Sequence, residues 1–527
     1  MPLTSKIGLS DSPHSGGRFF RVTPAAVATI VLLGIWLSLV IFTATRHEFW
    51  RDEVRALSLA RAASSPLDLY RLVQYDGHPA LWHLLLLVGT SIVDTPLVLP
   101  VTSILVAFAA VALFLYAAPF PIWARAIFMF SALAVFEYSV MARNYGISML
   151  LLFLSAVLYR SRTAHPFRLA FALALLANTN AHAAMFACLI AAVWLWDLAA
   201  DQWTGRAPRS VARYLPLALV AAGVLVSMAV AMPRESTILT PVREEGIAGR
   251  LDRGLMGAVL RPDLTFSELI PPYLRPKPAI LLLYGAAAGL ALRPNLLLAA
   301  LVAQTALGVF FRLVYPGWYR HQGLYLVFLV FLYWVLLESP GIRNVTGIRR
   351  LMLGGGLLAV LALVVFDVAR APGLLRADIT SARSSSRALG EFLRTSDAYR
   401  AAVVLGEPDF VLESLPYYAA NPIYLPRERR FSPTVSWTRD SKARLSLGEL
   451  LSAARDVRAR SGRPAVIVLA PIEFDRFPSG EQKYLYGSVF SWTPGEVEEF
   501  RRSTRLIAAF DAAAGDEDYM VYALEQP

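Results

Sequence analysis

Long apolar runs constrain this chain of 527 residues more than any other feature of its sequence. An α-helix needs about 20 mostly apolar residues to cross a bilayer, and runs near that length recur between residues 24 and 368. The chain is 56% hydrophobic and only 17% charged, whereas a soluble domain carries about 25% charged residues. The sequence therefore predicts a polytopic α-helical membrane protein.

The apolar run at 79–93 decides the topology, because it is short for a membrane span. If it crosses, the arginine-rich loops at 159–162 and 202–213 lie on the outer side of the membrane. If it packs along the outer face, arginines of nearly every later loop lie in the cytoplasm, as the positive-inside rule requires. We prefer this second topology of eleven spans, with twelve or thirteen as the alternative. The spans are expected near residues 24–44, 97–118, 124–140, 145–160, 167–181, 183–200, 212–232, 278–292, 295–314, 322–338 and 350–368.

This topology divides the chain into three parts. Residues 1–23 form a cytoplasmic tail and residues 24–370 form a transmembrane domain with outer loops at 46–96 and 233–277. From about residue 371 the charge density rises and short apolar runs alternate with amphipathic stretches. Strands are expected at 401–405, 464–470 and 519–524, and helices at 384–395, 446–460 and 494–503. Residues 371–527 are therefore predicted to be an α/β domain on the outer side.

The net charge of +11 does not indicate nucleic-acid binding, because the basic residues stand mostly at the ends of apolar runs. They are typical of topogenic charges that face an anionic membrane surface. Cys188 is the single cysteine, which excludes an internal disulfide and a cysteine-based metal site.

Two adjacent carboxylates, Asp52 and Glu53, follow the first span within Trp50-Arg51-Asp52-Glu53. Ionisable groups at such a depth usually face a polar site. The preferred topology brings further polar residues of span ends and outer loops to the same side, and these are Asp76, His78, Glu137, Arg143, Tyr145, His182, Arg320 and His321. They predict a polar cavity at the outer leaflet that contains carboxylates, imidazoles and cations.

This combination suits the transfer of a sugar from a lipid phosphate. Cations are needed on the phosphate, which becomes the leaving group, and a carboxylate is needed to accept the proton of the attacking hydroxyl. Arg320 and Arg143 are the expected phosphate ligands. In an adjacent pair of carboxylates, the like charges raise one pKa toward a useful value.

The chain resembles the GT-C superfamily of polyprenyl-phosphate-sugar-dependent glycosyltransferases. It is most similar to the bacterial aminoarabinose and galacturonosyl transferases of lipopolysaccharide, which are related to protein O-mannosyltransferases. The resemblance covers roughly residues 24–370 and rests on four pieces. These are Trp50-Arg51-Asp52-Glu53, His78-Pro79-Ala80-Leu81, the stretch 137–145 from Glu137 to Tyr145, and Tyr319-Arg320-His321.

The resemblance implies an inverting transfer in which Asp52 is the general base and Glu53 supports it or binds the acceptor. His78, Asp76 and His182 would line the sugar or acceptor pocket. Family members usually carry His-Pro-Pro where this chain has His78-Pro79-Ala80, a minor departure at a helix start. Some relatives bind a divalent metal, but the spacing of Asp52, Asp76, His78 and His182 does not define a metal site.

The implied partners are a polyprenyl-phosphate sugar, membrane lipids, and a hydroxyl acceptor on an envelope glycolipid, a polysaccharide or a protein. The implied location is the bacterial cytoplasmic membrane, with the active site and the C-terminal domain in the periplasm. A transporter or flippase of lipid-linked substrates is one alternative, although no two-fold repeat is visible. An O-antigen polymerase or ligase with a lipid-diphosphate donor is the other. The loop at 233–277 lacks the histidine typical of such enzymes and is expected to close over the donor.

Overall fold

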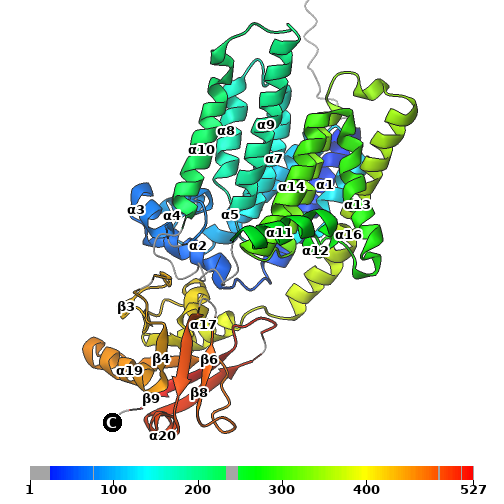
Figure 1. Ribbon diagram of the computed structural model, residues 1–527. Coiled ribbons are helices and arrows are strands. Elements are labelled where there is room, and N and C mark those ends of the chain that lie inside the picture. The colour runs from blue at the N-terminus through cyan, green and yellow to red at the C-terminus, as the bar shows by residue number, and fades with distance from the viewer. Residues whose placement is uncertain are drawn as a thin grey trace, which may run out of the picture.

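A helical bundle and a C-terminal α/β domain make up the protein, and helix α16 (Gly347–Thr380) leads from one to the other (Figure 1). The computed structural model describes residues 24–74, 76–232, 247–438, 440–484, 487–511 and 513–525. The predicted architecture, a polytopic helical protein with a C-terminal α/β domain, is confirmed.

Seven of the described helices are long and apolar enough to cross a membrane. They are α1 (Pro24–Ala44), α5 (Val98–Ala117), α9 (Ala181–Trp203), α10 (Leu215–Ala231) with the preceding turn η2 (Val211–Tyr214), α14 (Pro294–Leu313), α15 (Tyr319–Leu337) and α16. Shorter apolar helices complete the bundle, namely α7 (Tyr145–Arg160), α8 (Pro166–Ala177) and α13 (Lys277–Ala288) with η4 (Gly289–Leu292). All of these coincide with predicted spans.

The predicted continuous span at 124–140 is wrong, because the chain is broken there into α6 (Ile122–Met129) and the π-helical turn η1 (Leu133–Glu137). A break frees backbone groups that must find partners inside a membrane protein. The Asp367 carboxylate accepts the backbone N–H of Leu133 at 3.2 Å. A side chain of α16 thus stabilises the break.

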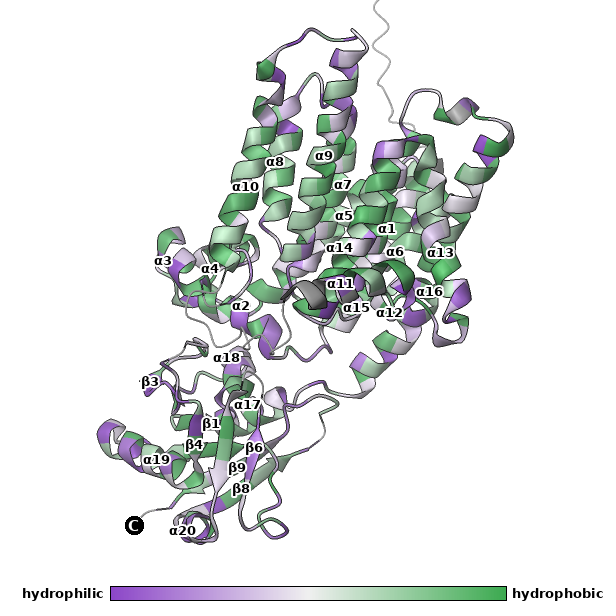
Figure 2. Cartoon of the chain, in the orientation of Figure 1, coloured by the Kyte–Doolittle hydropathy of each residue, from purple (hydrophilic) through white to green (hydrophobic). Residues whose placement is uncertain are grey.

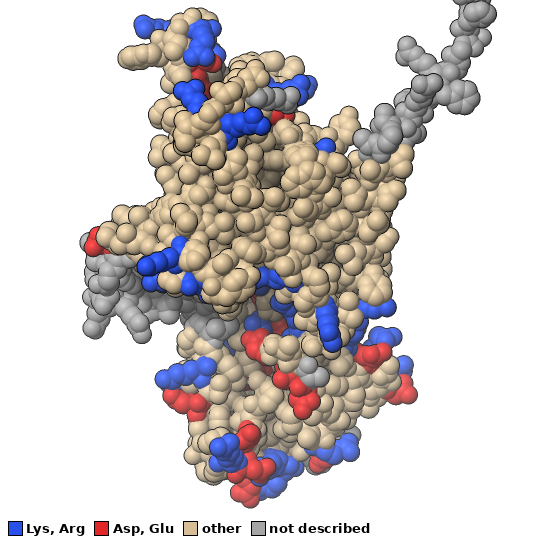
Figure 3. Space-filling view, turned by 90° about the vertical axis from the view of Figure 1, so that its right-hand side faces the viewer, with Lys and Arg blue, Asp and Glu red and all other residues tan. Residues whose placement is uncertain are grey.

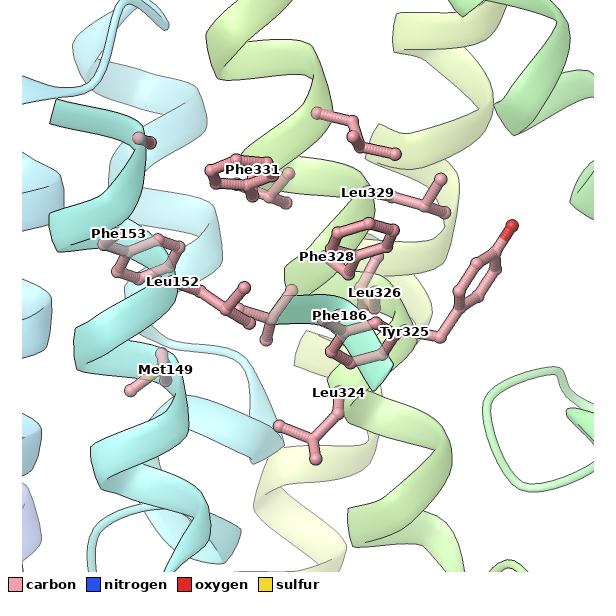
Figure 4. Close-up of a cluster of buried hydrophobic side chains, with 14 of the residues drawn as sticks. Met149, Leu152, Phe153, Phe186, Leu324, Tyr325, Leu326, Phe328, Leu329 and Phe331 are labelled. Atoms are coloured by element: carbon pink, nitrogen blue, oxygen red, sulfur yellow. The ribbon is translucent and has the colours of Figure 1, made fainter. Parts of the chain in front are cut away.

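Helix α15 is the centre of the bundle, and its residues from Gln322 to Leu336 are all buried. Its aromatic and aliphatic side chains pack against those of α7 and α9 (Figure 4). Phe186 and Phe328 stack with ring centroids 4.4 Å apart. This packing fixes the position of the residues that begin α15, Tyr319, Arg320 and His321.

Three short helices lie at the end of the bundle that faces the C-terminal domain (Figure 1). They are α2 (Arg51–Ala62), α3 (Pro66–Val73) and α4 (Leu81–Ile92). Val54 and Leu57 of α2 form a cluster with Trp82 and Leu86 of α4. Helix α4 therefore packs on α2 at this end of the bundle, and its expected place along the outer face of the membrane stays a prediction.

The described part of the loop expected at 233–277, residues 247–277, is largely helical. Helices α11 (Ile247–Leu260) and α12 (Pro262–Thr265) and the turn η3 (Pro272–Leu274) follow each other at the same end of the bundle (Figure 1). Residues 233–246 lie outside the described part of the chain.

The C-terminal domain contains a mixed six-stranded sheet of order β3-β2-β1-β5-β9-β8 and a three-stranded sheet of order β4-β7-β6. In the larger sheet, β1 runs parallel to β2 and β5, and the other pairs are antiparallel. The strands are β1 (Val403–Glu407), β2 (Ile423–Leu425), β3 (Arg430–Phe431), β4 (Arg444–Ser446), β5 (Ala465–Leu469), β6 (Gly480–Lys483), β7 (Val489–Trp492), β8 (Thr504–Phe510) and β9 (Tyr519–Leu524).

The buried side chains of β1 point alternately to the two faces of the sheet, because successive residues of a strand face opposite sides. Val403 and Leu405 belong to the core beneath α19 (Leu447–Ser461) and α20 (Pro494–Ser503), and Val404 belongs to the core beneath α17 (Ser386–Thr395). The turn η6 (Asp409–Ser414) and α18 (Leu415–Tyr418) follow β1 toward the bundle. The strands and helices predicted for this domain are confirmed.

The two parts differ in surface chemistry. The bundle is mostly hydrophobic and the C-terminal domain is mixed (Figure 2). Charged residues gather at the two ends of the bundle and on the C-terminal domain, and they leave a broad band almost free of Lys, Arg, Asp and Glu between them (Figure 3). Helix α16 contains residue 371, the expected domain boundary, and its 34 residues extend about 50 Å, longer than the bilayer core of about 30 Å. The protein is a multi-pass membrane protein.

Candidate active site

Helix α2 presents Asp52 and buries Glu53. Both acids lie in the first turn, where the helix dipole favours negative charge. The Asp52 side chain is 36% exposed, whereas the Glu53 side chain is completely buried. Of the two predicted catalytic carboxylates, only Asp52 is accessible to a ligand.

Arg143 forms the closest ion pair with Asp52. Its Nη1 donates a hydrogen bond of 2.6 Å to Asp52 Oδ2, and Arg51 Nε lies 3.9 Å from Oδ1. Partial burial acts to raise the pKa of Asp52, but Arg143, Arg51 and Arg320 outweigh it and hold the pKa below its ordinary value. Asp52 is therefore anionic at neutral pH and can accept a proton.

Glu53 holds the chain segment that carries Arg143. Its Oε1 accepts the backbone N–H of Ala142 at 2.7 Å, and its Oε2 accepts that of Trp50 at 3.4 Å. The Arg143 guanidinium lies 5.9 Å from the ring centre of Tyr145, at the start of α7. Glu53 thus fixes the geometry between Asp52 and Arg143 from the buried side.

His47 is a buried residue of this region that the sequence did not indicate. Its Nε2 lies 3.1 Å from Glu53 Oε2, and its Nδ1 lies 2.9 Å from Asp378 Oδ1 at the end of α16. Burial acts to lower the pKa of His47, but Glu53 and Asp378 outweigh it and raise the pKa to about 9. A charged imidazole in the segment between α1 and α2 therefore joins α2 to α16.

Asp76 is surrounded by cationic and imidazole groups. Arg55 Nε lies 2.6 Å from Asp76 Oδ1, and His78 Nδ1 and His83 Nε2 lie 3.2 and 3.3 Å from Oδ2. Burial acts to raise the pKa of Asp76, but these neighbours outweigh it and hold the pKa well below its ordinary value. His78, with 37% of its side chain exposed, also acts electrostatically on Asp52 and connects the two carboxylates.

His182 and His321 stack on each other with ring centroids 5.2 Å apart. The Tyr145 ring lies 5.5 Å from that of His321. His321 Nδ1 accepts the backbone N–H of Trp318, which leaves the proton of a neutral ring on Nε2. Both ring nitrogens of His182 are buried without a hydrogen-bond partner among the described residues. Buried polar atoms normally have partners, so these nitrogens are candidate ligand contacts.

Arg320 stands at the start of α15, with its guanidinium 5.6 Å from the ring centre of Trp50. Its Nη1 is buried and has no hydrogen-bond partner in the described part of the chain. Tyr138 fixes the backbone here, because its hydroxyl donates to the Arg320 carbonyl at 2.7 Å. Arg320 therefore offers an unsatisfied donor next to Asp52 and Arg143.

Glu137 occupies a different place. It is buried at the end of η1, where its charge acts on Tyr138 and Tyr319. Its Oε2 lacks a hydrogen-bond partner within the described residues. The structure thus places Arg143, Arg320 and His78 close enough to Asp52 to act on its charge. Glu137 lies instead near Tyr319, at the start of α15.

The acids and histidines of this region do not fit a divalent metal. No group of three or more metal-ligating side chains comes together among the residues that the structure describes. Asp52 faces two arginines, and Asp76 faces Arg55. These guanidinium groups already compensate the carboxylates.

Residues of the C-terminal domain also enter the region, and the sequence gave no signal for them. Glu413 Oε1 accepts a hydrogen bond from Arg55 Nη1, and Glu517 Oε1 accepts the backbone N–H of Arg51 at 3.1 Å. These contacts join residues more than 350 positions apart, which only the folded chain reveals.

No protein-family model matches the chain, and no curated protein matches it in sequence. Among solved structures, it is similar to ArnT from Cupriavidus metallidurans in the apo state and to the same protein bound to undecaprenyl phosphate. The TM-score is 0.47 in both cases, with sequence identities of 12% and 13%. Each match covers 95% of this chain and 98% of the other.

Proposed function

We propose that the protein is an inverting glycosyltransferase that moves a sugar from a polyprenyl phosphate to a hydroxyl group of an envelope glycolipid, a polysaccharide or a protein. The observation that carries the proposal is the pairing of Asp52 with Arg143 beside Arg320. An accessible anionic carboxylate and two guanidinium groups are the groups that this transfer requires. The sequence resemblance to GT-C glycosyltransferases supports the same reaction.

The reaction proceeds by displacement at the anomeric carbon. Asp52 accepts the proton of the acceptor hydroxyl as its oxygen forms a bond to that carbon. The bond between the anomeric carbon and the phosphate oxygen breaks, and its electron pair leaves with the polyprenyl phosphate. Arg143 and Arg320 stabilise the charge that develops on the phosphate. His78 and the unpartnered nitrogens of His182 bind hydroxyl groups of the sugar or the acceptor.

Donor binding also activates the base. In the free protein, the arginines hold the pKa of Asp52 below its ordinary value, which makes it a weak base. When an anionic phosphate pairs with Arg143 and Arg320, their effect on Asp52 is compensated and its pKa rises toward the working range. Asp52 thus becomes a stronger base only when the donor is in place.

The site faces the periplasm in this proposal. Helix α2, which carries Asp52, and the C-terminal domain lie at one end of the bundle, and the connections between α7 and α8 and between α9 and α10 lie at the other (Figure 1). At or beside these two connections the chain carries Arg160, Arg162, Arg206, Arg209 and Arg213. The positive-inside rule assigns the arginine-rich end to the cytoplasm. Residues 24–370 would then form the catalytic membrane domain, and residues 371–527 a periplasmic domain.

The test compares envelope glycolipids, polysaccharides and glycoproteins by mass spectrometry in cells that produce the wild-type chain, no chain, or Asp52→Asn. The proposal predicts a hexose-, pentose- or uronate-sized addition that requires the chain and is lost in Asp52→Asn. Asp94→Asn is the matched control, because Asp94 is an exposed partner of Arg61 in the same outer loop. Identical glycolipids, polysaccharides and glycoproteins with and without the chain would contradict the proposal.

A further inference from the structure

The segment that enters α2 is bound by the C-terminal domain. The Arg387 backbone N–H donates to Glu48 Oε1 at 2.7 Å, and Arg387 Nη2 donates to the His47 carbonyl at 2.5 Å. The Tyr418 hydroxyl donates to the Phe49 carbonyl at 3.0 Å. Three successive residues before α2 thus accept hydrogen bonds from this domain.

The domain also binds the first residue of α2. Arg51 donates from both Nη atoms to the Asp516 carboxylate, at 2.6 and 2.9 Å. Its backbone N–H, which has no partner within the helix, donates to Glu517 Oε1. Glu517 is buried, and its other oxygen accepts the hydroxyl of Ser414 at 3.0 Å. A fixed carboxylate of the C-terminal domain therefore caps the helix that carries Asp52.

One turn later in α2, Arg55 makes a second connection between this helix and the C-terminal domain. It lies on the same face of α2 as Arg51, because residues four apart are neighbours on a helix. Its guanidinium bridges Asp76 and Glu413, and both carboxylates are largely buried. Glu413 Oε1 also accepts the backbone N–H of Val435 at 2.7 Å. The C-terminal domain thus holds α2 on both sides of Asp52.

We propose that the C-terminal domain positions the base, and that Glu413 and Glu517 are positioning residues acting through Arg55 and Arg51. This inference rests on the proposed function, in which Asp52 must meet the acceptor proton within hydrogen-bond distance. Misplacement of a catalytic group by about 1 Å can cost about 100-fold in rate. Neither glutamate contacts the phosphate or the sugar in this account.

The first test measures sugar transfer by purified Glu413→Gln and Glu517→Gln in vesicles that contain a polyprenyl-phosphate sugar. We expect kcat to fall at least about tenfold and the donor KM to change less than about threefold. Asp516→Asn keeps the fold, because Asp516 is 60% exposed, and should lower kcat about two- to fivefold. The control Glu499→Gln removes an exposed ion pair with Arg455 on the same domain and should change nothing. Wild-type kcat in both glutamate variants, or an effect on KM alone, would overturn the inference.

The second test asks whether the glutamates act through Asp52. In an Asp52→Asn background, Glu413→Gln should lower the residual transfer no further, because the group that it positions is already lost. A full additional tenfold loss would show an effect independent of Asp52 and would overturn the inference.

Hydrogen exchange of the α2 amides supplies a readout that does not need activity. Both glutamate variants should raise the exchange of residues 51–62 at least about tenfold and leave β1 and β5 unchanged. Unchanged α2 exchange would overturn the positioning role, whatever the function of the protein. Raised α2 exchange together with wild-type transfer by Asp52→Asn would instead refute the base role of Asp52 and leave the docking intact.

Discussion

Arg143 donates a 2.6 Å hydrogen bond to Asp52, and Glu53 holds the backbone beside Arg143 through Ala142. The two adjacent carboxylates therefore have different tasks. Asp52 faces the site, and Glu53 fixes the arginine that Asp52 meets. An Asp-Glu pair at the start of one helix can do this because successive side chains of a helix point about 100° apart.

Arg143→Met should lower kcat/KM about 100-fold or more, because one phosphate ligand is lost. It should also move the acid limb of the pH–rate profile to higher pH. Arg143 is the strongest cation acting on Asp52, so its removal raises the pKa of the carboxylate. A pH–rate profile of kcat/KM checks this shift. Arg61→Met, which removes an exposed ion pair on α2, should leave the profile unchanged.

His47 should make the stability of the protein fall at alkaline pH. Its pKa is raised from 6.5 to about 9, so its stabilising effect is complete below pH 6.5 and is lost as the pH rises through 9. The loss amounts to about 3 kcal/mol. Unfolding midpoints in detergent between pH 6 and 10 should fall more steeply for the wild type than for His47→Gln. Parallel curves for the two proteins would contradict the assignment.

Asp197 should matter for stability and not for transfer. It lies at the opposite end of the bundle and accepts hydrogen bonds from Tyr159, Arg162, Arg293 and Asn295. Asp197→Ala leaves two arginines unpaired and should cost about 3 kcal/mol. Thermal unfolding should show the loss, whereas kcat at a permissive temperature should equal that of the wild type. A specific loss of kcat without a loss of stability would place Asp197 in the reaction.

Consecutive glycines of α16 allow a matched test of packing in the bundle. A Cβ on Gly356 would lie 2.6 Å from the Cα of Gly289, whereas one on Gly355 would meet no atom within 4 Å. Gly356→Ala should therefore destabilise the protein by about 1–3 kcal/mol. Gly355→Ala should be neutral or stabilising by up to about 1 kcal/mol, because alanine favours a helix over glycine. Equal unfolding midpoints for the two variants would contradict the close approach of η4 and α16.

The sequence was sufficient for much of the fold, because apolar runs and loop arginines report directly on membrane crossing. Choosing the topology from arginines alone placed Asp52, His78, Arg143 and Arg320 at one end of the bundle, where the structure has them. The break between α6 and η1 could not be foreseen, since it depends on Asp367, which is 234 positions away from Leu133. The roles of Glu413 and Glu517 could not be predicted either, because they depend on how the C-terminal domain packs against α2 and not on a local sequence pattern.

Transfer of a sugar by Asp52→Asn decides whether Asp52 is the general base. The variant keeps the size of the side chain and removes its ability to accept a proton at neutral pH. With purified protein in vesicles that contain a polyprenyl-phosphate sugar, we expect donor binding within about threefold of the wild type and a loss of transfer of at least about 100-fold. Near-wild-type turnover by this variant would contradict the account.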